Sequence, residues 1–211
     1  MNSLISQALL LQPATLTEYR SQGRCSFFCF KSNERKNMPH LFQGSTCLCG
    51  CFAAVISVTQ AVNNIKKLNR RYQYEMLEAL YAYLNDRNEL LDVMREGSSR
   101  PQVRAYLQCL KLKLKKDLNI DINVSLPLLR QKKIKQSDVL KFIDKYADIP
   151  KSSILFGLTG VHSHWTTADS VRNKNILLLD SSYLKRLPLR NFPTKHQISK
   201  NDVFLIKAEA V

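Results

Sequence analysis

The C-terminal third of the chain consists of short apolar runs separated by turn residues, a pattern typical of β-strands. Three of these runs predict successive strands at residues 153–158, 164–168 and 176–179. Gly160 and Asn173 stand in the two connections, where glycine and asparagine favour turns. Because strands joined by short turns pair antiparallel, we expect an antiparallel sheet here, with a further strand at residues 203–206.

The N-terminal half instead carries apolar residues at three- and four-residue steps, which predict helices. Residues 49–68 combine this spacing with small side chains, so we expect a helix that is central and buried. Further helices are expected at residues 72–94, 99–118 and 137–146. Helices that come first and strands that follow predict the α+β class.

Two parts of the chain differ in composition. Residues 1–37 have no sustained hydrophobic period and end in a polar run, so we expect a poorly structured N-terminal arm. Residues 38–211 are long enough for one domain with a sizeable core. The predicted domain has a helical half followed by an antiparallel sheet half.

The chain is strongly basic, with a formal net charge of +15, and this favours an anionic partner. The charge is concentrated in residues 100–151, which hold 13 Lys or Arg against five acids. We expect this segment either to be a solvated face, or to contact an acidic protein or an anionic surface. Nucleic acid is a further alternative, although no helix-turn-helix, zinc-finger or base-stacking signature supports it.

Cysteine usage indicates a reducing compartment. Three of the six cysteines alternate at Cys47, Cys49 and Cys51, which suits reactive or metal-bound thiols better than a disulfide scaffold. The early apolar run at residues 8–11 is too short for a signal peptide, and residues 47–62 are too short to span a bilayer. We therefore expect a soluble, cytoplasmic protein without a transmembrane segment.

The candidate chemistry combines a thiol, an imidazole and a carboxylate. Cys49 lies at the predicted start of a helix, where unpaired N–H groups and the helix dipole stabilise a thiolate. Gln43, six residues earlier, is placed to supply a second donor for an oxyanion beside the Cys49 N–H. His164 opens one predicted strand and Asp180 closes the next, so the two side chains would meet in an antiparallel pair and form the orienting half of a nucleophilic site.

These residues together resemble the papain-like cysteine peptidases. The resemblance lies in a Gln-x5-Cys-Gly motif on a small-residue helix, a His-aromatic-Thr motif on a strand, and an acid sixteen residues after the histidine. Within that superfamily the chain is similar to the peptidases that cleave double-glycine leaders from bacteriocin precursors, and to their stand-alone relatives. The likeness covers two stretches, residues 43–60 and 152–182, and makes residues 97–150 a basic helical insertion in a papain-like domain.

The resemblance implies a role for each residue. Cys49 would be the nucleophile and His164 the general base and acid. Asp180 would orient the imidazole and Gln43 would donate to the oxyanion, and no cofactor is expected. Cys51 departs from the small or proline residue usual after Cys-Gly in that branch, so which of the three clustered thiols reacts stays open.

Two metal sites are alternatives to this interpretation. His162 and His164 would face the same side of a strand and could bind a metal ion with Asp180 or a thiol. The second alternative is a thiolate zinc site made of five cysteines: Cys25, Cys29, Cys47, Cys49 and Cys51. We rank the histidine site below the thiol site because no further His or Cys cluster stands at a standard zinc spacing from it. The cysteine site ranks lower because Cys-x-Cys spacing is uncommon in zinc sites and the stretch between the two cysteine groups is not compact.

The sequence therefore predicts a thiol-dependent peptidase that acts on a peptide or protein by acyl transfer. The alternative is a non-catalytic papain-like module that binds a peptide or an acidic partner through its cleft and basic helices. Whether such an enzyme would hydrolyse, transfer or deamidate is left open by the residues.

Overall fold

The computed structural model describes residues 41, 47–161, 163–182 and 184–210, and the predicted arm at residues 1–37 lies outside this part. The helices are α2 (Cys49–Val62), α3 (Arg70–Asn85), α4 (Leu90–Glu96), α5 (Arg100–Leu118) and α6 (Gln136–Ala147). The strands are β1 (Ile120–Ser125), β2 (Ser152–Gly160), β3 (His164–Arg172), β4 (Asn175–Leu179), β5 (Arg186–Pro188) and β6 (His196–Ala210). A short 3₁₀ helix, Leu189–Asn191, follows β5.

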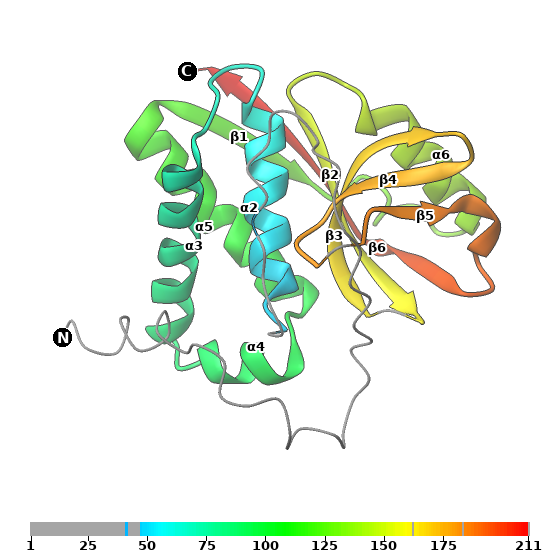
Figure 1. Cartoon of the computed structure of the whole chain (residues 1–211), viewed down its shortest axis with the longest axis horizontal. Coiled ribbons are helices and arrows are strands. Elements are labelled where there is room, and N and C mark those ends of the chain that lie inside the picture. The colour runs from blue at the N-terminus through cyan, green and yellow to red at the C-terminus, as the bar shows by residue number, and fades with distance from the viewer. Residues whose placement is uncertain (1–40, 42–46, 162, 183, 211) are drawn as a thin grey trace.

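The strands form one antiparallel sheet in the order β1-β6-β2-β3-β4-β5. Helix α2 packs on one face of the sheet with α3 and α5 behind it, and α6 packs against the other face (Figure 1). The α+β class is therefore confirmed, with a helical half that carries Cys49 and a sheet half that carries His164.

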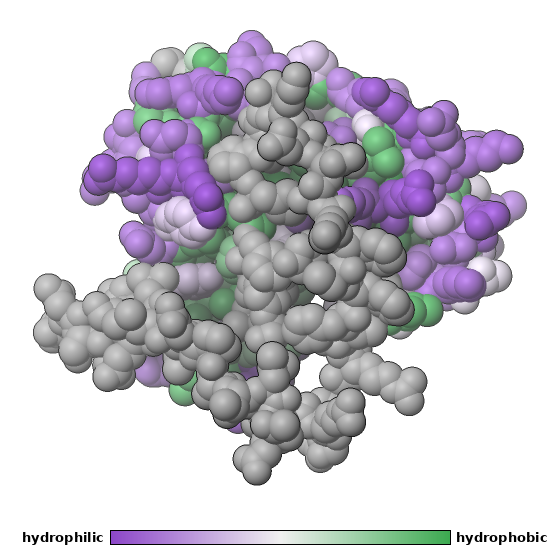
Figure 2. All heavy atoms as spheres, viewed as in Figure 1, coloured by the Kyte–Doolittle hydropathy of each residue, from purple (hydrophilic) through white to green (hydrophobic). Residues whose placement is uncertain are grey.

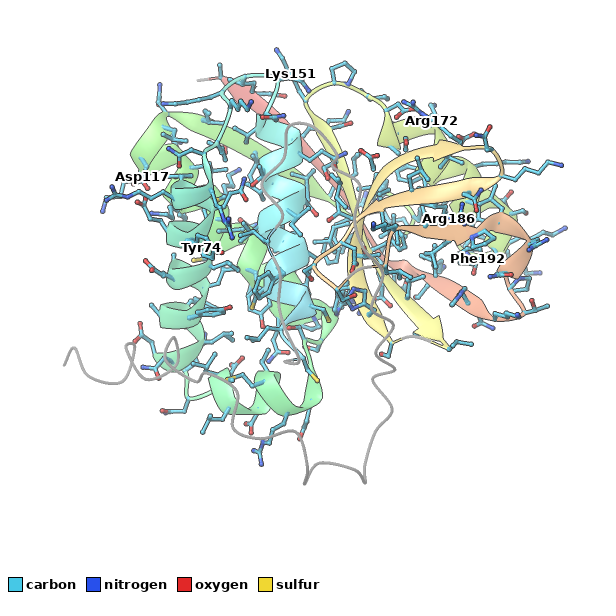
Figure 3. The ribbon with its side chains drawn as sticks, viewed as in Figure 1. Tyr74, Asp117, Lys151, Arg172, Arg186 and Phe192 are labelled. Atoms are coloured by element: carbon cyan, nitrogen blue, oxygen red, sulfur yellow. The ribbon has the colours of Figure 1, made fainter. Side chains whose placement is uncertain are left out.

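Side chains on the two faces of the central strands pack into two separate cores, because side chains alternate in direction along a strand. On β2, Leu155 packs into the core around α2, whereas Ile154 and Phe156 pack into the core under α6. Exposed charges such as Arg172 and Arg186 lie on the outside of the sheet half (Figure 3). Within the described residues, none of the helices is both long and apolar enough to cross a membrane.

Helix α2 is buried along almost its whole length, as its small residues predict. Its two hydroxyl side chains bond to carbonyls one turn back, Ser57 to Ala53 and Thr59 to Val55, so their burial leaves no donor unsatisfied. The helix ends at Val62, not at Leu68 as the pattern predicts, since two asparagines of low helix propensity follow.

The predicted single helix at residues 72–94 is wrong, because the chain turns between α3 and α4. Asn88 adopts a left-handed conformation (φ 57°) that ends the helical path, and asparagine tolerates this region better than most residues. Strands β1 and β5 are not predicted by the pattern, and β6 extends far beyond residues 203–206.

The hairpin formed by β3 and β4 places the end of β4 beside the start of β3. Asn173 and Lys174 both have positive φ angles of 50° and 58°, the geometry of a tight hairpin turn that matches strand twist. Thr167 pairs with Leu179, so the residue that follows β4 lies beside the start of β3. This register sets the place of Asp180 relative to His164.

Gly50 permits the close approach of α2 to the connection between α4 and α5. A Cβ atom at this position would lie 2.6 Å from both Cβ and Oγ of Ser98 and 3.2 Å from a methyl group of Val103. Since Ser98 Cβ cannot rotate away, only glycine lets the start of α2 sit this close.

Gly50→Ala is expected to destabilise the fold by about 1–3 kcal/mol through overpacking. Urea unfolding followed by circular dichroism measures the change. Without the contact to Ser98, the same substitution would stabilise a helix, because alanine has the higher helix propensity. A rise in unfolding midpoint would therefore contradict the close packing.

Candidate active site

Cys49 is the first residue of α2, and its side chain lies at the boundary between the two halves of the fold, 7% exposed. The N-cap residue Leu48 supplies no side-chain acceptor, and the first turn of the described helix contains no acid. The N–H groups of this turn and the positive end of the helix dipole therefore remain available to an anion.

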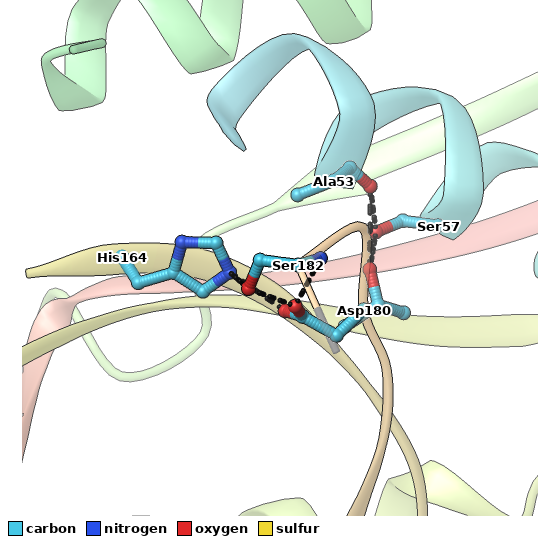
Figure 4. A network of polar contacts seen from close by, with 6 residues as sticks. Ala53, Ser57, His164, Asp180 and Ser182 are labelled. Atoms are coloured by element: carbon cyan, nitrogen blue, oxygen red, sulfur yellow. Dashed lines mark hydrogen bonds and ion pairs between the residues drawn. The ribbon is translucent and has the colours of Figure 1, made fainter. Parts of the chain in front are cut away.

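His164 and Asp180 form a hydrogen-bonded pair. The Nε2 atom of His164 lies 2.7 Å from Oδ2 of Asp180, and the side chains are 11% and 2% exposed. Ser182 binds the other carboxylate oxygen twice, through its backbone N–H at 2.7 Å and its hydroxyl at 2.6 Å (Figure 4). Both oxygens of the buried carboxylate are thus held in place.

Cys49 belongs to the same group, since its side chain contributes to the pKa of His164. Burial lowers the pKa of His164, but the hydrogen bonds and charges of Asp180 and Cys49 outweigh it and raise the pKa to about 10. Burial opposes ionisation of Asp180, yet His164 and the Ser182 hydroxyl hold the pKa of this carboxyl below its usual value. The site therefore favours an imidazolium next to a carboxylate.

The neighbouring thiols occupy different surroundings. Cys51 is fully buried, and this burial raises its pKa to about 12 even though the Tyr106 hydroxyl bonds to it. Cys47 precedes the helix and is half-buried, and its N–H donates to Met94 O at 3.4 Å. Cys49 is among the groups that raise the pKa of His164.

Four predicted residues lie outside the part of the chain that the structure describes. Gln43, His162, Cys25 and Cys29 belong to this group. Among the described residues, no group of three or more His, Cys, Asp or Glu side chains could hold a metal ion. Both metal alternatives need residues outside this part of the chain and stay predictions, whereas the described residues include a thiol, an imidazole and a carboxylate.

Buried hydroxyl groups join the helix that carries Cys49 to the strand that carries His164. Ser57 Oγ lies 2.7 Å from Thr167 Oγ1, and both hydroxyls lie within hydrogen-bond reach of the Ala53 carbonyl (Figure 4). Such a link is not visible in the sequence, because it joins residues 110 positions apart.

A second link runs through Trp165, the residue that follows His164 in β3. Its ring is 9% exposed and packs against Phe204, with centroids 6.1 Å apart. Its indole N–H also donates to the Ser98 carbonyl at 2.7 Å. The residue after His164 is thus tied to the same connection that packs against Gly50.

Ser182 is the site residue that the sequence analysis missed. The signal was present, since a serine two residues after an aspartate is a common partner in local side-chain turns. Its importance becomes visible only when Asp180 is seen to be buried.

Comparisons with known proteins show similarity in structure but not in sequence. No family model matches the chain, and no curated protein matches it. A solved structure that resembles it is a double glycine motif protease from an AMS/PCAT transporter, in complex with the leader peptide. The two chains are 13% identical with a TM-score of 0.43, and the match covers 82% of this chain and 91% of that chain. This degree of likeness does not assign a family.

Asp180→Asn is expected to lower the pKa of His164 by about one to three pH units. Burial disfavours the imidazolium, and the substitution removes the carboxylate that offsets this effect. In the unchanged protein the raised pKa stabilises the fold fully below pH 6.5, and this contribution is lost as the pH rises through about 10. Titration of the His164 ring by NMR measures the pKa directly. Asp144→Asn, on exposed α6, is the matched control and should leave the midpoint unchanged. Equal midpoints in all three proteins would refute the coupling.

Proposed function

We propose that this protein is a cysteine peptidase that cleaves a peptide or protein substrate by acyl transfer through Cys49. The observation that carries the proposal is the 2.7 Å hydrogen bond between His164 and Asp180, together with the Cys49 side chain, which helps to raise the pKa of His164. A thiol at a helix N-terminus beside an oriented imidazole is the arrangement that nucleophilic thiol chemistry requires.

The first half of the reaction forms a thioester. The Cys49 thiolate attacks the scissile carbonyl carbon, and the carbonyl electrons move to the oxygen. The Cys49 N–H donates to this oxyanion, and Gln43 is the candidate for a second donor. The protonated His164 then gives its proton to the amide nitrogen as the C–N bond breaks, and the amine product leaves.

The second half restores the enzyme. His164, now neutral, takes a proton from water as the water oxygen attacks the thioester carbon. Collapse of the intermediate breaks the C–S bond and releases the acid product. The thiolate and the imidazolium are regenerated, so protons and electrons balance over the cycle.

Asp180 and Ser182 have positioning roles in this scheme. Since Nε2 of His164 faces Asp180, the other ring nitrogen is the one that serves Cys49. Ser182 gives its only hydroxyl proton to Asp180 at 2.6 Å, so its oxygen presents a lone pair to Nε2 at 3.4 Å. Both contacts favour a proton on Nε2 and hold the ring in place.

A second function is supported by the burial of Cys49. With 7% of the residue exposed, a substrate carbonyl has little access to the sulfur unless neighbouring groups move. A papain-like module that binds a peptide without cleaving it would also use this fold, and residues 100–151 would offer an acidic partner a basic surface. Reactivity of the thiol separates the two functions.

Iodoacetamide is expected to label Cys49 at neutral pH faster than it labels an ordinary thiol, because His164 is the candidate base that would take the thiol proton as the sulfur attacks. His164→Ala should slow this labelling about tenfold or more, and Cys51→Ala, which removes an inert thiol, should not change it. Peptide mass spectrometry at timed intervals gives the rate for each cysteine. Slow labelling that His164→Ala leaves unchanged, with peptide binding that survives Cys49→Ala, would select the non-catalytic module.

Ser182→Ala is expected to move the acid limb of the labelling profile to higher pH. The loss of one donor raises the pKa of Asp180 and so weakens its support of the imidazolium. Ser182→Thr keeps the hydroxyl and should restore the original profile. A profile in Ser182→Ala that overlays that of the unchanged protein would remove Ser182 from the site.

A further inference from the structure

A cavity of about 540 Å³ lies beside the start of α6, on the sheet face opposite α2. Four lysines line it: Lys132, Lys133, Lys135 and Lys200. Apolar side chains, including Val139 and Ile198, form part of its wall. Hydrophilic side chains also predominate on the visible face of the sheet half, where β3, β4 and β5 lie (Figure 2).

The charges around this cavity are unbalanced. The one carboxylate in the lining is Asp138, and it already accepts a hydrogen bond from the Lys135 backbone N–H at 3.1 Å. The Lys200 ammonium donates to the Gln131 carbonyl, which is neutral and leaves its charge uncompensated. Four ammonium groups around one space repel one another, so an anion between them would lower the energy.

Gln136 adds a donor that has no acceptor. Its Oε1 atom accepts from the Ile198 backbone N–H at 3.1 Å, and this bond fixes which way the amide points. The Nε2 atom is buried, and no residue in the described part of the chain accepts a hydrogen bond from it. A buried donor without a partner costs about 1–3 kcal/mol. Since Nε2 has almost no accessible surface, an acceptor in the cavity would recover this energy through a small movement of the Gln136 side chain.

The backbone contributes charge of the same sign. Helix α6 begins at Gln136 and runs for 12 residues, so the positive end of its dipole lies at the cavity. Lysine ammonium groups, an amide donor and a helix N-terminus thus come together in one lining, and each of them prefers an anionic oxygen.

The geometry points to a binding site for a small organic phosphate, with its phosphate groups against the lysines and Gln136 and its organic part against Val139 and Ile198. The volume is in the range of small-molecule sites. Lysines bind phosphate as point charges, and a diphosphate offers enough negative charge to match the net excess of the lining. This site is independent of the proposed peptidase function, because it lies on the other face of the sheet.

The test is calorimetric titration of the full chain with ADP and with inorganic pyrophosphate at constant ionic strength. We expect one site, with ADP bound more tightly because its organic part meets the apolar wall. Lys132→Gln with Lys133→Gln should weaken ADP binding at least tenfold. Lys115→Gln with Lys116→Gln, an equal loss of charge at the exposed end of α5, is the matched control and should change the affinity less than twofold.

Gln136→Glu isolates the orphan donor. The variant keeps an oxygen for the Ile198 N–H and replaces the amide NH₂ group by an anionic oxygen, so it should abolish binding while the protein stays folded by circular dichroism.

Equal effects of the two lysine pairs would show that net charge alone attracts the ligand and would overturn the site. No binding of either probe would overturn it as well, and equal affinity for both would overturn the role of the apolar wall. The labelling rate of Cys49 should be unchanged in every variant, so failure here is distinguishable from failure of the peptidase proposal.

Discussion

The contact between α2 and β3 is the constraint on which the rest of the structure depends. It joins a residue of the helical half, Cys49, to His164, which follows 115 positions later. Small side chains on α2 allow the two elements to pack closely, and the hydrogen bond between the Ser57 and Thr167 hydroxyls fixes the position of the helix along the strand. In a core packed this tightly, a shift of one element is transmitted to the other. The packing between α2 and β3 therefore determines the relative positions of the site residues.

Burial of Asp180 imposes the second condition on the site. A carboxylate with 2% of its side chain exposed is costly unless its oxygens are paired, and His164 and Ser182 together provide that pairing. The same burial strengthens the interaction between the carboxylate and the imidazole, because few water molecules screen it. Stability and the charge state of the site therefore come from the same three side chains.

Features that depend on local pattern were predicted from the sequence, whereas features that depend on distant partners were not. The α+β class, the central helix and the strands around His164 follow from periodicity and turn residues. Strand β5 has three residues at a sheet edge, so its pairing rather than its pattern defines it. Strand β1, at the other edge, does alternate apolar and polar residues, and this signal was not recognised because the basic segment around it resembles a helical region. The break at Asn88 depends on one backbone angle, and the contacts of Ser182 and Ser98 depend on tertiary placement. Gln43 lies outside the described residues and stays a prediction.

Strand β6 has a position that bears on how the molecule is made. It lies between β1 and β2, so residues 120–125 reach the rest of the sheet only through residues 196–210. A ribosome that has synthesised α2 to β5 has therefore released all three groups of the site but not the strand that joins the sheet. Pairing of β1 with the rest of the sheet therefore has to wait for the last strand, and such long-range pairing forms slowly compared with contacts between neighbouring helices.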